Sequence, residues 1–198
     1  MAKPAEKRIA RRNDVVQAAL RVIARDGLEN ASFRAIANEL GSTIGVLTHY
    51  FPNREALMRL VLETVSDRIR QAFESHGDIN TLEGFEALAA ELLPLDAASR
   101  ALWKIWLSFA VASNAVADLA QNHSERYAGM IADIARTVKR LQDAGVLARN
   151  IDANAEAEAL VCLIDGVGIH GVLMPERMTP ARQRSILHRF FADLASQV

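Results

Sequence analysis

Two short runs of helical periodicity, separated by one glycine, constrain the fold of this chain more than any other feature. Apolar residues share one helical face up to Leu40, and a second apolar face begins after Gly41. Gly41 can take the left-handed backbone conformation that ends a helix, and the small side chain of Ala37 lets two helices approach closely. Ser32 and Thr43 precede the two helices, where their hydroxyl groups can cap free N–H groups. The segment therefore predicts a helix-turn-helix unit.

In such a unit the second helix lies in the major groove of DNA and presents the side chains near its N-terminus to base edges. The residues expected to read bases are Ile44, Val46, Thr48 and His49. Arg54 begins the next helix, where its guanidinium and the positive end of the helix dipole would act on the same phosphate. The full set of expected DNA-binding residues is Arg34, Thr43, Ile44, Val46, Thr48, His49, Tyr50 and Arg54. An ordinary helical hairpin inside a core is the alternative interpretation.

The stretch GSTIGVLTHYFPNREAL resembles the DNA-binding signature of the TetR family, which has a glycine, a short recognition helix, an aromatic pair and a basic helix start. The resemblance covers roughly Arg11 to Val61 and includes the first helix with its glycine stop. It implies a homodimeric transcriptional regulator that binds DNA. Ile44 stands where the family often has lysine or another polar residue, and Thr48 stands where it often has an aromatic one. The resemblance therefore implies DNA binding without implying which operator is read.

The charge of the chain changes sign along its length. Residues 1–60 hold ten Lys or Arg against six Asp or Glu, for a charge of +4, whereas the remaining residues hold 13 against 18, for −5. The two parts together give the net charge of −1 at pH 7. The basic residues of the N-terminal arm are Lys3, Lys7, Arg8, Arg11 and Arg12. This arm suits phosphate contacts or entry into the minor groove, and a solvated tail is the alternative.

Helical periodicity runs through the whole chain, and no segment shows the alternation of a β-strand. We therefore expect an all-α fold of about nine helices. The expected parts are a helix-turn-helix DNA-binding domain at residues 1–53, a linking helix at 54–75, and a ligand-binding and dimerisation domain at 76–198. The helices expected in the last part are Leu82–Leu92, Ala97–Val111, His123–Ala144, Ala153–Leu173 and Pro180–Ser196.

An almost wholly apolar segment, ALWKIWLSFAVA, contains both tryptophans of the chain. Aromatic rings that line a helical cavity often hold an organic ligand, so we expect Trp103, Trp106 and Phe109 to contribute to ligand binding. Packing in a core is the alternative for each of these rings.

A second apolar segment, EAEALVCLIDGVGIHGVL, is interrupted by one carboxylate, Asp165. An unpaired buried carboxylate is costly, so Asp165 is expected to pair with an internal cation, to sit exposed, or to face a cationic ligand. His170 is expected to face the ligand cavity or a subunit interface, and Cys162 to be a buried, unreactive thiol.

The short motifs KIWLSF and LIDG resemble those of BetI-type members of the TetR family, which regulate choline-to-betaine metabolism. Some of those relatives carry an aromatic residue where this chain has Ala110. The resemblance makes choline one candidate ligand.

One recognition helix reads few base pairs, so two heads of a homodimer are expected to bind two half-sites of a palindromic operator. The last two helices are apolar enough to form a four-helix interface between subunits. The residues expected there are Leu160, Leu163, Ile164, Val167, Ile186, Leu187, Phe190 and Leu194. The expected mechanism is a repressor in which ligand in the body shifts the linking helix, so that the heads no longer fit the operator. An activator that needs ligand for binding, and a helical small-molecule carrier without DNA function, are the alternatives.

Sequence features of an enzyme are missing from the chain. Its five histidines form no metal-ligand pair on one helix face, and neither a nucleophile elbow nor a phosphate-binding loop is present. The string GVGIHG has a dinucleotide-type glycine pattern without the strand that should precede it. We expect no enzymatic activity, no cofactor and no metal. The N-terminus lacks the apolar run of a signal peptide, and no segment is apolar enough to span a bilayer, so we expect a cytosolic protein without a membrane partner.

Overall fold

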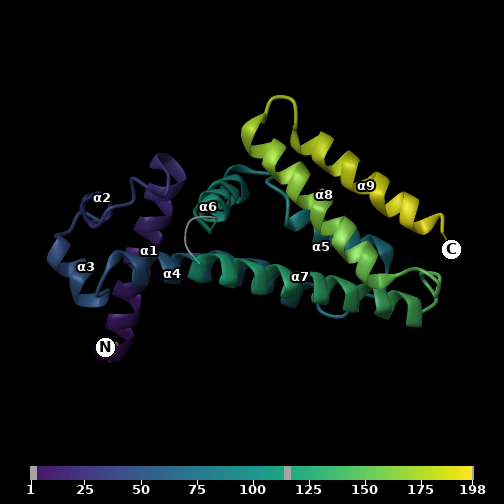
Figure 1. Cartoon of the computed structure of the whole chain (residues 1–198), viewed down its shortest axis with the longest axis horizontal. Coiled ribbons are helices and arrows are strands. Elements are labelled where there is room, and N and C mark those ends of the chain that lie inside the picture. Colours follow the sequence, from purple (N-terminus) through teal and green to yellow (C-terminus); the bar gives the residue numbers. More distant parts are fainter. Residues whose placement is uncertain (1–3, 114–116, 198) are drawn as a thin grey trace. The chain divides into compact units, whose positions relative to one another are not determined.

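The computed structural model describes residues 4–113 and 117–197, and these ranges contain nine α-helices and no strand (Figure 1). The helices are α1 (Pro4–Asp26), α2 (Phe33–Glu39), α3 (Ile44–Tyr50), α4 (Arg54–His76), α5 (Leu82–Glu91), α6 (Ala97–Ser113), α7 (Ala117–Asp143), α8 (Ala153–Leu173) and α9 (Pro180–Ala195). The predicted all-α fold is confirmed. The helix predicted from His123 begins earlier, at Ala117, and Lys3 of the basic arm lies outside the described residues.

The chain forms two compact units, which we call the head and the body. The head comprises residues 1–67 and 104–111, and the body comprises residues 68–103 and 112–198. Two helices belong to both units. α4 passes from head to body after Asp67, whereas α6 gives Lys104–Val111 to the head and both of its ends to the body. α4 covers the segment predicted as a linking helix, while the shared membership of α6 was not predicted.

The head is built around apolar side chains from α1, α2, α3 and α4. The buried residues that α1 contributes to this core include Val16, Ala19, Leu20 and Ile23. α1 ends before Gly27, whose φ of 85° favours glycine. Other fully buried side chains of the head are Ile36, Leu47, Phe51, Leu57 and Val61. Each contributes roughly 1.5–3 kcal/mol when it is removed from water, so this core fixes the two short helices α2 and α3.

The body core lies among α5, α7, α8 and α9. α7 packs along α8, and α9 packs on both α5 and α8. The largest fully buried side chains of the body core are Phe85, Leu88, Leu93, Ile134, Leu141 and Phe191. The rings of Phe85 and Phe191 meet edge-on, with 5.1 Å between their centroids, and so join α5 to α9.

Side-chain caps confirm three predicted helix starts in the body. The carboxylate of Asp96 accepts a hydrogen bond from the backbone N–H of Ser99 at 2.7 Å, just before α6. Asp152 caps α8 by accepting from the N–H groups of the first turn. Thr179 caps α9, which has proline in its first turn.

A fully buried glutamine fixes the turn between α8 and α9. Nε2 of Gln183 donates to the carbonyl oxygen of Met178 at 2.9 Å and to that of Pro94 at 3.4 Å. Gly171 of α8 leaves room for this amide, because a Cβ there would lie 2.8 Å from Nε2. The turn is therefore tied to the loop after α5 by polar contacts inside the body.

The prediction for Cys162 is wrong, and the predicted subunit interface is wrong for five of its eight residues. Cys162 is exposed and not buried, because it lies on the face of α8 that the body core does not cover. Five residues expected at a subunit interface are at most 5% exposed, since they pack inside their own chain: Leu160, Ile164, Val167, Leu187 and Leu194. Any contact between subunits through α8 must therefore use other side chains. None of the described helices combines the length and the hydropathy needed to cross a membrane.

Candidate DNA-binding and ligand-binding sites

The recognition helix α3 is held in the head by one fully buried side chain, Leu47. Around it, Ile44, Thr48 and His49 are exposed, and Val46 is half-buried. Ile44 is unusual for an apolar residue because 42% of its surface is exposed. The helix thus offers an apolar, a hydroxyl and an imidazole side chain to a partner while Leu47 anchors it.

The turn before α3 has the geometry that its glycine predicts. Gly41 has a φ of 63°, and the N–H of Ser42 donates to the carbonyl of Ala37 at 2.9 Å, which closes the end of α2. Ser32 caps α2 by accepting from the N–H of Ala35 at 3.2 Å. The predicted cap at Thr43 is wrong, because its hydroxyl makes no cap hydrogen bond and its carbonyl instead accepts the first backbone bond of α3. The Thr43 side chain is exposed.

Arg54 is placed differently from the expectation of a phosphate contact. Its Nε donates to the carbonyl oxygen of Ala31 at 3.0 Å, and its Nη2 donates to that of Leu28. These bonds tie the start of α4 to the loop between α1 and α2. Asn53 caps the same helix by accepting from the N–H of Ala56 at 2.8 Å.

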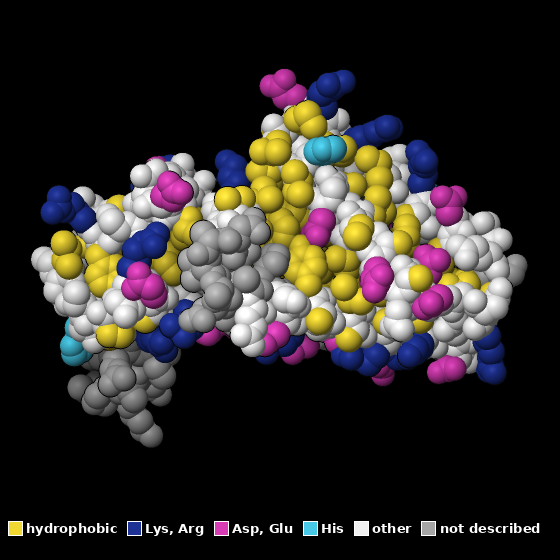
Figure 2. Space-filling model, viewed as in Figure 1, with side chains coloured by type: hydrophobic (Ala, Val, Ile, Leu, Met, Phe, Trp, Pro, Cys, Tyr) yellow, Lys and Arg dark blue, Asp and Glu magenta, His cyan; other side chains and the backbone are white. Residues whose placement is uncertain are grey.

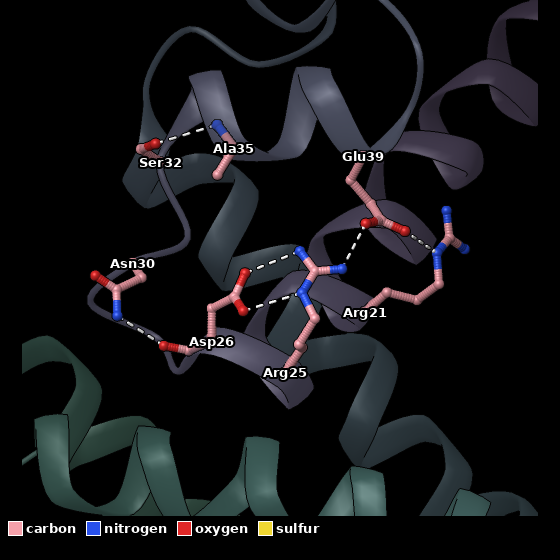
Figure 3. A network of polar contacts seen from close by, with 7 residues as sticks. All are labelled: Arg21, Arg25, Asp26, Asn30, Ser32, Ala35 and Glu39. Atoms are coloured by element: carbon pink, nitrogen blue, oxygen red, sulfur yellow. Dashed lines mark hydrogen bonds and ion pairs between the residues drawn. The ribbon is translucent and has the colours of Figure 1, made fainter.

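An ion-pair network that the sequence analysis missed joins α1 to α2 (Figure 3). Glu39 accepts from Arg21 at 2.8 Å and from Arg25 at 2.8 Å, and Arg25 also forms a two-bond pair with Asp26. These hydrogen bonds lower the pKa of Glu39 and of Asp26, and they raise the pKa of Arg25. The i, i+4 spacing of Arg21 and Arg25 places both side chains on one face of α1, and this was the available sequence signal. That Glu39 lies opposite them depends on how α1 crosses α2.

The remaining DNA-binding candidates lie on the head surface. Arg34 is exposed on α2, and Tyr50 is half-buried at the end of α3. The His49 ring meets the Tyr50 ring edge-on, with 4.9 Å between centroids. Arg12 of the basic arm lies over the Phe51 ring, 5.4 Å from its centroid, so this arm residue also packs on the head.

In the body, Trp103 contacts both the end of α5 and the backbone of α8. Its Nε1 donates to the carbonyl of Leu92 at 2.8 Å. Its ring lies on the backbone of α8 at Gly168, where a Cβ would come within 2.2 Å of ring atoms. These contacts support the core-packing alternative for Trp103.

Asp165 of α8 faces α7. The hydroxyl of Tyr127 donates to its Oδ2 at 2.7 Å, and both side chains are half-buried. Burial raises the pKa of Asp165, although the hydrogen bond from Tyr127 opposes the shift, and burial together with the carboxylate raises the pKa of Tyr127. The role of Tyr127 could not be predicted from the sequence, because nothing local to it shows which α8 residue it meets.

The five predicted ligand-binding residues divide between the two units. Trp103, Asp165 and His170 belong to the body, whereas Trp106 and Phe109 lie on the part of α6 that belongs to the head. Phe109 is buried, Trp106 is half-buried and His170 is exposed. Within the body, α8 is the helix that both Trp103 and Tyr127 contact.

A short exposed helix, anchored by one leucine and entered through a glycine turn, places the protein among helix-turn-helix DNA-binding regulators. The model of the tetR family of bacterial regulatory proteins matches residues 15–61. The model of the C-terminal part of BetI-type transcriptional repressors matches residues 82–196, which is more than half of the chain. The chain therefore belongs to the TetR family, with a body of the BetI type, and is a ligand-responsive transcriptional regulator.

Similar proteins match over nearly the whole chain. The HTH-type transcriptional regulator PksA of Bacillus subtilis is 29% identical over 181 residues, covering 89% of this chain and 86% of that protein. The HTH-type transcriptional regulator BetI of Vibrio vulnificus is 26% identical over 190 residues, covering 91% and 90%. A putative transcriptional regulator from Saccharomonospora viridis, solved in complex with choline, is 26% identical, with a TM-score of 0.80 and coverage of 91% and 95%.

Proposed function

We propose that the protein is a homodimeric repressor that binds a palindromic operator through α3 and leaves it when a cationic organic molecule binds in the body beside Asp165. The proposal of a cationic ligand rests on the surroundings of the Asp165 carboxylate. It is half-buried, and among the described residues no Lys or Arg forms an ion pair with it. Burial disfavours the charged form of the carboxylate, and a cation bound beside it would restore that form.

Choline is the first ligand to test. The regulator from Saccharomonospora viridis was solved with choline, and several relatives carry the name BetI. The ring of Tyr127, whose hydroxyl reaches Asp165 at 2.7 Å, adds an aromatic face of the kind that attracts quaternary ammonium groups.

Calorimetric titration with choline and with its neutral isostere 3,3-dimethylbutan-1-ol tests the charge of the ligand. We expect choline to bind at least about tenfold more tightly, the equivalent of about 1.4 kcal/mol. Asp165→Asn should remove this preference while its amide oxygen still accepts from Tyr127. Equal affinity of the wild type for both compounds would exclude a cation-selective site.

For the DNA, we assign base contacts to the exposed side chains of α3, Ile44, Thr48 and His49. An exposed isoleucine suits the methyl group of thymine, and hydroxyl and imidazole groups suit polar base edges. Arg34 and Thr43 are assigned to phosphates, because both are exposed on the head beside α3. Footprinting of the region upstream of the gene, with wild type and with His49→Ala, tests the assignment. Loss of sequence preference in the variant, with non-specific binding retained, is the expected outcome.

Release from the operator is assigned to the helices that both units share. Ligand beside α8 is expected to shift α4, so that the two heads no longer match the half-site spacing. A gel shift at fixed salt with saturating choline tests this coupling, and unchanged operator affinity would contradict it. This function needs no enzymatic step and places the protein in the cytoplasm with its operator.

A further inference from the structure

The glycines of α8 have different surroundings. A Cβ at Gly168 would lie 2.2 Å from the ring of Trp103, and a Cβ at Gly171 would lie 2.8 Å from the amide of Gln183. A Cβ at Gly166 would meet nothing within 4 Å, and the helical backbone there has no positive φ. Glycine in an exposed helix interior costs about 1 kcal/mol relative to alanine. The contacts within the chain thus explain two of these glycines and leave Gly166 unexplained.

A second open glycine shows what is particular about Gly166. Gly129 of α7 also has nothing within 4 Å of a Cβ, but it lies among charged, exposed neighbours such as Glu125 and Arg136. Gly166 instead lies in an apolar stripe that recurs every three or four residues along α8 and is not covered by the body core. The stripe consists of Ala155, Ala159, Cys162, Gly166, Ile169 and Leu173.

The stripe is exposed to a degree that is uncommon for apolar side chains. Leu173 is 68% exposed, and Ile169 is half-buried. Figure 2 shows hydrophobic side chains gathered on the face of the body that carries α8 and the start of α9. A contiguous apolar patch of this kind marks a contact surface.

The stripe is complementary to itself in the antiparallel direction. When a second α8 runs antiparallel, with the two-fold axis level with residue 164, Ala155 comes opposite Leu173 and Ala159 comes opposite Ile169. Cys162 then comes opposite Gly166. Each level of the seam joins a smaller side chain to a larger one, as close packing requires. No other antiparallel register pairs all six residues of the stripe with one another.

The charges of α8 also favour the antiparallel direction. Glu156 and Glu158 lie in its first half, and the exposed ionisable side chain of its second half is His170. Antiparallel packing brings the acidic half of one helix beside the partner's half without exposed acids, and it sets the two helix dipoles antiparallel to each other. Parallel packing would bring the acidic halves together.

We propose that α8 packs antiparallel on α8 of a second copy, with the two-fold axis between Cys162 and Gly166, and that Gly166 is glycine because the partner's Cys162 lies against it. The inference rests on the homodimer of the proposed function and adds its register. It replaces the buried residues that the sequence suggested for the interface by the exposed stripe.

Cysteine pairs at opposite levels of the seam test the register in the full-length protein. In a Cys162→Ser background, the double variant Ala159→Cys, Ile169→Cys should give a covalent dimer on a non-reducing gel after mild oxidation. A disulfide within one chain is excluded, because the two positions lie about 15 Å apart along the helix. Each single variant should stay uncrosslinked, because the two thiols of its dimer, one on each copy of α8, would also lie about 15 Å apart along the helices.

A matched control shifts one cysteine by a helical turn. Ala159→Cys with Leu173→Cys carries a thiol at the more exposed position, and we expect no more covalent dimer from it than from the single variants. Equal cross-linking of both double variants would overturn the register. Failure of both, in protein that sediments as a dimer, would also overturn it while leaving the homodimer intact. Monomeric wild type at micromolar concentration, with and without operator DNA, would overturn both proposals.

Substitution of the glycine itself gives a second measurement. A Cβ added at Gly166 meets nothing within 4 Å in its own chain, whereas a leucine side chain there would collide with the partner helix. We expect the dissociation constant of the dimer to rise at least about tenfold in analytical ultracentrifugation, with Gly166→Ala giving a smaller rise. An unchanged dissociation constant for Gly166→Leu would contradict the proposal.

Discussion

Arg54 holds the first turn of α4 to the loop between α1 and α2 through the carbonyl oxygens of Ala31 and Leu28. These carbonyls lie more than twenty residues earlier in the sequence. The sequence located the arginine at a helix start, but the loop that comes to face it depends on how the head folds. We therefore expect Arg54 to influence DNA binding through the shape of the head.

Replacing Arg54 with glutamine should destabilise the head by about 1–3 kcal/mol, because part-buried carbonyls lose charged donors. Operator affinity should fall, yet the slope of log affinity against log salt should stay that of the wild type. Arg34→Ala is the control, since this exposed arginine is assigned to a phosphate and its loss should reduce the slope by about 1. Gel shifts over a range of salt concentrations check both. A reduced slope for Arg54→Gln would place the guanidinium on a phosphate after all.

The network around Glu39 should make the stability of the head depend on acid. Because hydrogen bonds from Arg25 and Arg21 lower the pKa of Glu39 in the folded state, its contribution is present above the unfolded pKa. That contribution is lost as the pH falls through the folded pKa. Melting temperatures from pH 6 down to pH 3, followed by circular dichroism, should therefore fall less for Glu39→Gln than for the wild type. Parallel curves would show that the exposed network contributes nothing measurable.

The pKa shift of Asp165 makes stability depend on pH in the opposite direction. Its pKa is raised above the ordinary 3.8, so the folded state binds a proton more readily than the unfolded state, and stability falls as the pH rises from that value toward the folded pKa. Asp165→Asn should therefore raise the melting temperature of the ligand-free protein at neutral pH while weakening choline binding, as expected for a residue kept for binding. A lower melting temperature would show that the fold itself satisfies the charge. Tyr127→Phe, which removes the hydroxyl at 2.7 Å, is the companion variant.

At the scale of helices, local patterns predicted most boundaries because caps and periodicity are set by neighbours in sequence. Asp152 and Thr179 cap the two helices that were predicted to begin directly after them. The predicted cap at Thr43 was wrong because residue type alone does not determine whether a side chain at the N-cap position makes the hydrogen bond. Tyr127 was missed because the register between α7 and α8 is a tertiary property. Cys162 was misplaced because α8 is apolar on both of its faces, so its sequence does not show which face the core covers.

Two glycines of α8 give a matched test of this packing. Alanine gains the same helix propensity at either position, about 1 kcal/mol, so the variants differ only in what the new methyl group meets. Gly168→Ala should destabilise the body by about 1–3 kcal/mol, because the methyl group would force the ring of Trp103 off α8. Breaking the bond from Trp103 to Leu92 should also red-shift its fluorescence, measured in a Trp106→Phe background. Gly166→Ala should leave the emission unchanged, and an equal shift in both variants would contradict the assignment.

At the scale of the whole molecule, the order of a basic head followed by an acidic body was readable from charge and motif, and family membership agrees with it. The division of α6 between the head and the body could not be predicted from the sequence, because its apolar sequence fits either unit. Continuous helices shared by two units are suited to carry a shift from one to the other. α4 and α6 are therefore the elements in which a ligand effect on the operator should be sought.

If ligand and operator are coupled through these helices, the coupling must be reciprocal. A ligand that lowers operator affinity by some factor must bind the operator complex more weakly than the free protein by the same factor, typically about 5–150-fold. We expect choline titrations, in the presence of saturating operator DNA, to give a dissociation constant raised by the factor that gel shifts report for DNA. Scrambled DNA of the same length is the control and should leave choline affinity unchanged. Unequal factors under identical salt would mean that ligand and operator act on different species, such as monomer and dimer, and would require the oligomeric state to be included in the mechanism.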